Sequence, residues 1–503
     1  MNKLTTAFFL LLLLCISERM LSQEEKDPLS IEIETHLRFL ASDELEGRAT
    51  GMPGNDVAAA YISAYFRANG LNQVPNAVGY GQEIPFVMTS PPASASFSWG
   101  DTNWEFAKDF IVSKGKKIEL EAEAVFVDYG LMDEDKGIDD YEGLDLKGKI
   151  VIANLGAPGV ENPGELIRLG NQKRAWVAER GGIALVELWR QSRIPWRFAT
   201  MRLNRKRLQI APSADLESPE ALLTHIWAED KETHFAQALN KGKGVNVQLK
   251  HSGVHQAYRG SKNILGYIEG TDPELKQEYL LITAHYDHVG TGPSGGRISP
   301  TDSIFNGARD NAIGTVSLMT AAKLLAANPP RRSVLFLAVT AEEIGLLGSA
   351  YYAANPLLPL KDMVFDLNCD GAGYNDKTSL TVIGFNHVDF QSIAQEAAQK
   401  FELNATDDPV PQQNLYDRSD NASFAAKGIP SVNVSPGVKA FDQELMKYYH
   451  QVADEAESLD FDYVARFVKS FAEIASILAN ADQVPTWREE SKYAGKGKEL
   501  YEK

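Results

Sequence analysis

The sequence is short of cysteine and has no excess of positive charge. It holds two cysteines in 503 residues, and 50 Lys and Arg against 68 Asp and Glu give a net charge of −18. Phosphate backbones repel such an acidic chain, which excludes nucleic acid as a partner on electrostatic grounds. No internal repeat is evident, and beyond the N-terminus no segment is apolar enough to cross a bilayer. With 44% hydrophobic residues, the chain is expected to form a globular protein of two or three domains.

Residues 1–22 have the pattern of a signal peptide. The apolar run from Ala7 to Ile16 is too short to span a bilayer comfortably, but it fits the core of a signal. We expect cleavage near Ser22–Gln23 and export to the periplasm or the medium, with an uncleaved anchor as the alternative. Cys15 follows a bulky residue, unlike a lipoprotein site, so it is assigned to the signal. The mature chain would then keep only Cys369 and form no intramolecular disulfide.

Residues 253–482 alternate between expected strands and expected helices. Apolar runs such as LLITA, SVLFLAV and MVFDLNC are separated by helical patterns. This alternation predicts an α/β fold with a doubly wound, mostly parallel sheet, in which ligands bind beyond the carboxyl ends of the strands. Residues 28–117 are expected to open the same domain, with Asp43, Glu44 and Glu46 in a solvated loop. The Lys- and Glu-rich residues 483–503 are expected to form a charged surface tail.

Residues 118–252 have a different character. AEAVFVDYG and KIVIANLG are β-rich runs, Lys173–Glu179 is an expected helix, and Gly182–Glu187 is a further buried strand. The stretch KGKGVNVQLKH closes the region as a last strand. We therefore predict a compact β-rich module inserted into the larger domain.

The stretch LITAHYDHVG carries the first candidate site. A buried strand over Tyr279–Ile282 delivers His285, Asp287 and His288 at its polar end. Residues two apart on a strand project to the same side, so His285 and Asp287 can face one site. An imidazole can bind a metal through one nitrogen while a carboxylate fixes the other. Alone, this pair favours a hydrogen-bonded core histidine, and it is the downstream sequence that favours a metal site.

Four further segments place acidic or imidazole side chains just past a strand or at the start of a helix. They contribute Asp310, the pair Glu342 and Glu343, Asp370, and His450. Each has a structural alternative, such as a helix cap, a solvated turn or a surface position. Together they converge at the strand ends of a parallel sheet. Nitrogen and oxygen ligands without thiolate suit a hydrolytic zinc site, and two metals sharing a bridging carboxylate would use the whole set.

The order of the motifs HYD, ARDNAIG, AEEIGLLGS, NCDGAG and YYHQVADE resembles peptidase family M28, a family of co-catalytic zinc metallopeptidases. DLKGKIVIANLG and KRAWVAERGGIALV resemble a protease-associated (PA) domain, which many members carry as an insert. HLRFLASDELEGRATG is similar to the N-terminal segment of the family, so the resemblance spans residues 30–480. It implies a zinc-peptidase fold of the phosphorylase/hydrolase-like type, an inserted PA domain and two Zn²⁺ ions.

The resemblance also implies a role for each motif residue. Five side chains would hold the two metals: His285 and Asp370 on one zinc, Glu343 and His450 on the other, and Asp310 bridging both. Glu342 would be the general base for a water shared by the zincs, Asp287 would hold His285, and Tyr449 would donate to the oxyanion. Arg418 and Asp420 would contact substrate or support the site.

The resemblance implies a peptidase that acts on peptides, and the expected signal peptide would export it. An acidic site suits the free α-amine that an aminopeptidase binds. A glutamate-carboxypeptidase-like enzyme is the alternative, because Arg309 or Arg418 could bind a terminal carboxylate. Arg309 stands where the family often has a small or acidic residue. A glutaminyl cyclase and a silent binding module are further alternatives that the complete ligand set disfavours. Cys369, where many members have a bulky aliphatic residue, is expected to face the core.

Overall fold

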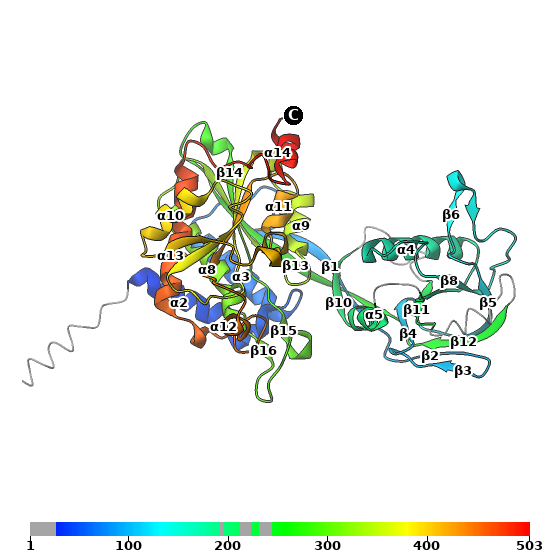
Figure 1. Cartoon of the computed structure of the whole chain (residues 1–503). Helices are drawn as coiled ribbons and strands as arrows, with labels where there is room; N and C mark the ends of the chain where they lie inside the picture. Colours follow the sequence, from blue (N-terminus) through cyan, green and yellow to red (C-terminus); the bar gives the residue numbers. More distant parts are fainter. Residues whose placement is uncertain (1–26, 191–194, 212–222, 231–243, 503) are drawn as a thin grey trace, which may run out of the picture. The chain divides into compact units, whose positions relative to one another are not determined.

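The computed structural model describes residues 27–190, 195–211, 223–230 and 244–502 (Figure 1). The chain divides into two compact units, Met1–Ile84 with Gly260–Lys503, and Pro85–Arg259. It passes between them within two long strands, β1 (Gly81–Ser90) and β13 (His255–Ile268). The expected signal peptide, residues 1–22, lies outside the described residues.

The first unit is built on a sheet whose strands run in the order β1-β13-β17-β14-β18-β21-β19-β20. Its centre is parallel and consists of β17 (Ser333–Val339), β14 (Tyr279–His285), β18 (Met363–Cys369) and β21 (Ser431–Pro436). On either side of this centre, β13 and β19 (Ser379–Ile383) are antiparallel to their inner neighbours, and β20 (Asn404–Asp407) is parallel to β19. The predicted α/β fold is confirmed, with antiparallel strands only outside the parallel centre of the sheet.

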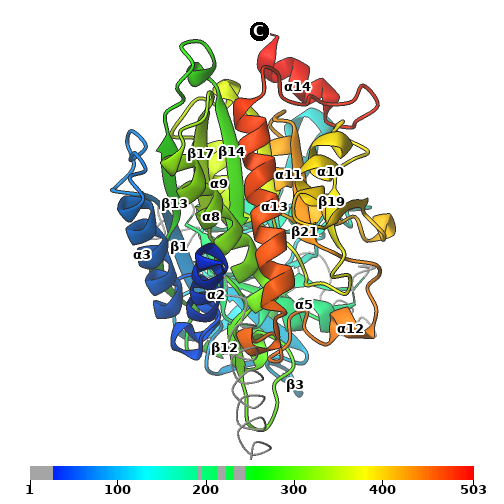
Figure 2. The same ribbon diagram turned by 90° about the vertical axis from the view of Figure 1, so that its left-hand side faces the viewer.

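Helices cover both faces of this sheet. One face packs against α2 (Pro28–Leu40), α3 (Pro53–Ala68), α8 (Ile313–Ala327), α10 (Gln391–Gln399) and α13 (Phe461–Asn480), several of which lie in front of the strands in Figure 2. The other face packs against α9 (Leu347–Ala354) and α11 (Asn421–Ala425). Side chains alternate between the two cores along each strand, as Leu280 and Leu281 do on β14. No helix among the described residues has the length and apolarity needed to cross a bilayer.

The C-terminal segment is packed rather than a free surface tail. It forms α14 (Ala494–Tyr501), and the Trp487 indole donates to the carbonyl of Gly428 at 2.8 Å. The Tyr501 hydroxyl donates to the carbonyl of Met363 at 2.5 Å. The expectation of a charged tail over 483–503 was therefore wrong, because a few aromatic anchors in a Lys- and Glu-rich segment determine how it packs.

The second unit contains a sheet of order β3-β2-β12-β5-β8-β9-β11-β4. Its parallel centre is β5 (Ile118–Phe126), β8 (Ile150–Asn154), β9 (Ala184–Leu188) and β11 (Thr224–Ala228). The unit begins at Pro85, so the boundary predicted at residue 118 falls inside it. The reason is non-local pairing: β2 (Ala95–Trp99) pairs with β12 (Val245–His251), and β4 (Phe110–Lys114) pairs with β11.

A buried ionic network ties α4 (Pro163–Glu179) to this second sheet. The Lys173 ammonium and the Glu187 carboxylate are both fully buried and lie 2.8 Å apart. The second carboxylate oxygen of Glu187 lies 2.9 Å from His225 Nε2 and accepts from the Trp227 indole at 3.2 Å. Burial by itself would raise the pKa of Glu187, but Lys173 and His225 lower it to about 2. The carboxylate therefore stays charged and depends on these partners.

Replacing Lys173 with methionine should destabilise the second unit by about 3–5 kcal/mol, because the Glu187 charge would remain buried without its cation. The matched control is Lys108→Met, which removes an exposed pair with Glu105 whose side chains are 64% and 65% exposed. That change should cost less than about 1 kcal/mol. Urea unfolding followed by tryptophan fluorescence measures both. Equal losses in the two variants would contradict this account of the network.

Candidate metal centre

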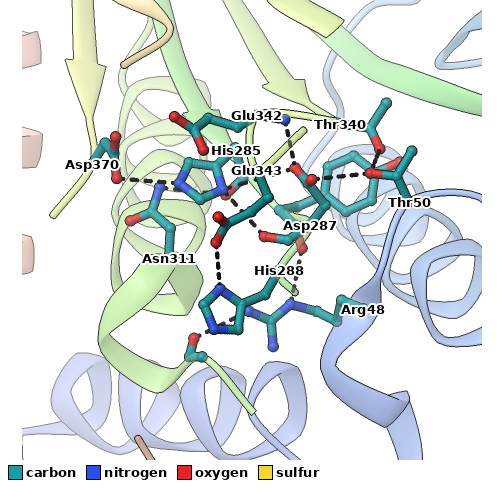
Figure 3. A network of polar contacts seen from close by, with 12 residues as sticks. Arg48, Thr50, His285, Asp287, His288, Asn311, Thr340, Glu342, Glu343 and Asp370 are labelled. Carbon is teal, nitrogen blue, oxygen red and sulfur yellow. Dashed lines mark hydrogen bonds and ion pairs between the residues drawn. The ribbon is translucent and has the colours of Figure 1, made fainter. Parts of the chain in front are cut away.

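The structure brings all five expected metal ligands to one edge of the sheet of the first unit. Three of them lie at or beyond the ends of strands: His285 ends β14, Glu343 follows β17 and Asp370 follows β18. Asp310 lies in the turn Ala308–Ala312 ahead of α8, and His450 follows α12 (Gln443–Met446). Because β14, β17 and β18 are parallel, their carboxyl ends meet at the same edge. Figure 3 shows His285 between Asp370 and Glu343.

The five side chains form two groups of three that share one carboxylate. His285 Nε2 lies 3.1 Å from Asp370 Oδ1 and 3.5 Å from Asp310 Oδ1. His450 Nε2 lies 3.1 Å from Asp310 Oδ2 and 3.2 Å from Glu343 Oε2. Asp310 thus points one oxygen toward each group.

The spacing and chemistry of these atoms fit two zinc ions. Zinc bonds of about 2.1 Å hold tetrahedral ligands about 3.4 Å apart, and the separations within the two groups run from 3.1 to 3.5 Å. All of the donors are nitrogen or oxygen. Cys369, the one cysteine among the described residues, is buried in the hydrophobic core of the first unit, and its thiol does not belong to the ligand set. The expectation that its thiol faces the core is confirmed.

The charges of the site also call for cations. Burial alone would lower the pKa of His285, but the carboxylates of Asp370 and Glu342 raise it well above its ordinary value. Burial would likewise lower the pKa of His450, yet Asp310 and Glu343 raise it to about 10. These imidazoles hold protons that a metal ion would displace, so metal binding must weaken as the pH falls.

Asp287 contacts His285 differently from what the sequence implied. His285 Nδ1 lies 3.1 Å from the backbone carbonyl of Asp287 and 3.8 Å from its carboxylate. The carboxylate instead accepts from Thr50 Oγ1 at 2.9 Å and from the backbone N–H of Glu342 at 3.2 Å (Figure 3). The chain turns after β14, so the carbonyl reaches the ring first. Burial raises the pKa of Asp287 to about 6.

Glu342 lies beside both groups without belonging to either. Burial raises its pKa well above the ordinary value, and the carboxylates of Asp370, Glu343 and Asp420 add to this effect. Among the described residues, no side chain donates a hydrogen bond to its carboxylate, which lines the pocket over the two groups. A carboxylate with a raised pKa in this position can accept a proton near neutral pH.

Arg48 is a structural part of the site that the sequence did not reveal. Its guanidinium is buried and donates to the carbonyls of Tyr286 at 2.9 Å, Asn306 at 2.6 Å and Gly307 at 3.1 Å. These bonds join the end of β14 to the turn that carries Asp310. Sequence reasoning placed the neighbouring acidic residues in a solvated loop, and they are exposed. Arg48 also donates to the nearby carbonyl of Leu40, but nothing local marks an arginine whose other partners lie more than 230 residues away.

Arg309 is not available to a substrate. Its side chain is 3% exposed, it pairs with Asp454 at 3.0 Å, and its guanidinium lies 3.7 Å from the centre of the Tyr448 ring. The Asp454 carboxylate also accepts from the backbone N–H of Arg309 at 2.9 Å and from that of Asp310 at 3.3 Å. The suggestion that Arg309 binds a terminal carboxylate was therefore wrong, because this arginine holds the Asp310 turn in place.

The described residues that line the pocket beside the two groups include one arginine and no lysine. Arg418 is exposed at its rim and donates to the Tyr449 hydroxyl at 3.3 Å. Asp420 is fully buried behind the pocket and does not line it, and burial raises its pKa to about 7. Apolar side chains form much of the remaining wall: Ile383, Pro409, Leu415, Val438 and Phe441.

Part of the chain matches a known protein family. Residues 263–475 match the family model of Peptidase family M28. The matched region belongs to peptidase family M28. It contains every expected metal ligand together with Glu342, Tyr449, Arg418 and Asp420.

Curated relatives match part of the chain. The vacuolar membrane protease of Kluyveromyces lactis is 31% identical over 210 residues, which are 39% of this chain and 20% of the relative. Aminopeptidase YwaD of Bacillus subtilis is 28% identical over 231 residues, 44% of this chain and 45% of the relative. The chain thus spans less than half the length of these relatives. A solved aminopeptidase from Aneurinibacillus sp. strain AM-1 covers 90% of this chain, and 95% of its own chain is matched. The TM-score is 0.51 at 17% identity, which shows a common fold.

Proposed function

We propose that this protein is a di-zinc metallopeptidase that removes residues from the amino end of peptides. The observation that carries the proposal is the position of Asp310, which points one oxygen into each group of ligands. His285 and Asp370 would hold one zinc with Asp310, and Glu343 and His450 would hold the other. Membership of family M28 and the printed names of the aminopeptidase relatives support the same chemistry.

When bound, two zinc ions would lower the pKa of a bound water from about 15.7 toward neutrality and polarise the scissile carbonyl. Glu342 accepts the proton of the attacking water and passes it to the leaving amine. Burial raises the pKa of Tyr449, so its hydroxyl keeps its proton and can donate to the developing oxyanion. Arg418, which donates to that hydroxyl, orients it toward the reacting carbonyl.

The amino end of the peptide is the better match for this pocket. Carboxylates gather around the two groups, and they would attract a protonated α-amine rather than a terminal carboxylate. Because Arg309 is paired with Asp454, only Arg418 remains at the described pocket wall to bind a carboxylate. A single exposed arginine is a weak binding site for a terminal carboxylate. The pocket therefore favours an aminopeptidase over a carboxypeptidase. The complete two-metal set also argues against a glutaminyl cyclase and a silent binding module.

Leucyl-p-nitroanilide should be hydrolysed, and acetylation of its amine should lower kcat/KM by about 10⁴-fold, because the buried acidic groups would lose their partner. The matched probe is an N-blocked dipeptide with a free carboxyl end, which should remain intact. Release of its C-terminal residue would instead identify a carboxypeptidase. Cyclisation of an N-terminal glutamine would identify the cyclase, and loss of every activity in zinc-loaded protein would identify a binding module.

We also propose that residues 1–22 direct export and are removed, which leaves a periplasmic or secreted enzyme. Their apolar core carries this proposal. We propose further that the second unit contains a PA-like domain, because it combines parallel strands with α4. Mass spectrometry of protein recovered from the host in which it is exported should find Gln23 or a neighbouring residue at the N-terminus.

A further inference from the structure

His288, the second histidine of the stretch LITAHYDHVG, has no role in the proposed function. Its side chain is 2% exposed, and its backbone N–H donates to the carbonyl of Arg48 at 3.4 Å. Gly307 packs directly against the ring, where a Cβ atom would lie 2.6 Å from the ring carbons Cγ and Cδ2. The imidazole is therefore held in one place beneath the turn that carries Asp310.

The ring makes the shortest polar contact of Glu343. His288 Nδ1 lies 2.6 Å from Glu343 Oε1 (Figure 3). The other oxygen, Oε2, lies 3.2 Å from His450 Nε2. The two oxygens of this carboxylate thus face different partners. Oε1 is occupied by His288, and only Oε2 points toward the group formed with His450 and Asp310.

The surroundings of the ring determine which of its two nitrogens carries the proton. His288 Nε2 is buried and has no hydrogen-bond partner among the described residues. A proton on Nε2 would be unpaired, whereas a proton on Nδ1 is donated to the Glu343 carboxylate. The second-nearest carboxylate, Asp310 Oδ1, is 3.9 Å from Nδ1, beyond hydrogen-bond distance.

We propose that His288 is a positioning residue that holds Glu343 so that it binds its metal through Oε2 alone. The inference rests on the proposed two-metal site. His288 donates from Nδ1, keeps Oε1 out of the coordination sphere and orients Oε2 toward the ion shared with His450 and Asp310. Outer hydrogen bonds of this kind are worth about 10–100-fold in metal affinity.

A competing role is direct ligation, because His288, Asp310 and Glu343 also offer ligand atoms within 4.8 Å of one another. Two variants separate the roles. His288→Asn keeps an N–H donor close to the position of Nδ1 but loses the ring. His288→Leu keeps most of the volume but has no donor. Thermal unfolding of the metal-free proteins checks that both variants fold.

Zinc titration of the metal-free proteins by calorimetry is the test. His288→Leu should weaken the site of Glu343 by about 10–100-fold and leave the site of Asp370 within about twofold, while His288→Asn stays within about threefold at both. Equal weakening in both variants, or none in His288→Leu, would overturn the proposal. Wild-type protein that binds no zinc would instead remove the proposed function itself.

A crystal structure of the zinc-loaded wild-type protein decides the same point without a variant. His288 Nδ1 should remain hydrogen-bonded to Glu343 Oε1 and stay outside bonding distance of both metals. A zinc–nitrogen distance of about 2.0–2.1 Å at His288 would make it a ligand and overturn the positioning role.

Discussion

Replacing Glu342 with glutamine is expected to lower kcat by about 10²–10⁴-fold while both metals stay bound. Glutamine has the same shape but cannot accept the proton of the attacking water. Glu342 belongs to neither group of ligands, so zinc affinity should change little. Steady-state hydrolysis of leucyl-p-nitroanilide and the zinc content of the same preparation measure the two effects.

Glu343→Gln is the matched comparison, because it makes the same carboxylate-to-amide change at the neighbouring residue. This residue lies between two histidines, His288 at 2.6 Å and His450 at 3.2 Å. Its amide should weaken one zinc site and thereby lower activity through metal loss, which excess zinc partly restores. Excess zinc should not restore Glu342→Gln. Near-normal turnover in Glu342→Gln would remove this residue from the role of general base.

Asp310→Ala is expected to have the largest effect on metal content. Within the part of the chain that the structure describes, Asp310 is the one carboxylate shared by both groups, at 3.5 Å from His285 and 3.1 Å from His450. Its loss removes a ligand from each zinc and leaves Asp370 and Glu343 without the cations that offset their repulsion. Both zinc ions should be lost on dialysis, and hydrolysis should fall below detection.

His450→Ala provides the comparison for that result, since it removes a ligand from one group only. Its zinc content should fall to about one ion per chain, with the His285 and Asp370 group still loaded. Atomic absorption after dialysis against metal-free buffer distinguishes one ion from none. If Asp310→Ala kept one zinc per chain as His450→Ala does, the shared position of Asp310 would be wrong.

The residues that could be predicted from sequence are those whose positions follow from local pattern. His285, Glu343 and Asp370 stand directly beyond buried strands, and the parallel order of those strands dictates that they meet. The wider fold follows from the same alternation. Asp310 and His450 lie in irregular segments, and their placement was implied by the family motifs rather than by periodicity.

What could not be predicted depends on contacts between distant segments. Arg48 bonds to carbonyls near residues 286 and 306, and Asp454 anchors the Asp310 turn through Arg309. The residues next to Arg48 and Asp454 in the sequence do not indicate these partners. The extent of the second unit was also hidden, because β2 and β4 show their membership only through pairing with strands more than 100 residues further along. The contact of Asp287 depends on how the chain turns after β14.

The hydrogen bonds around Asp310 show how the turn that carries this buried carboxylate is held in place. Backbone groups of its turn are held by Arg48 from one side and by Asp454 from the other. Both holding side chains are buried and far from solvent. The carboxylate that we propose as the bridge is therefore supported by buried hydrogen-bond partners, as two ligand groups with a common member require.

The zinc stoichiometry of the purified wild-type protein tests the central claim most directly. Two zinc ions per chain are expected, with leucyl-p-nitroanilide hydrolysis lost on treatment with a chelator and restored only as the second ion returns. A protein that carries one zinc or none at full activity would contradict the account.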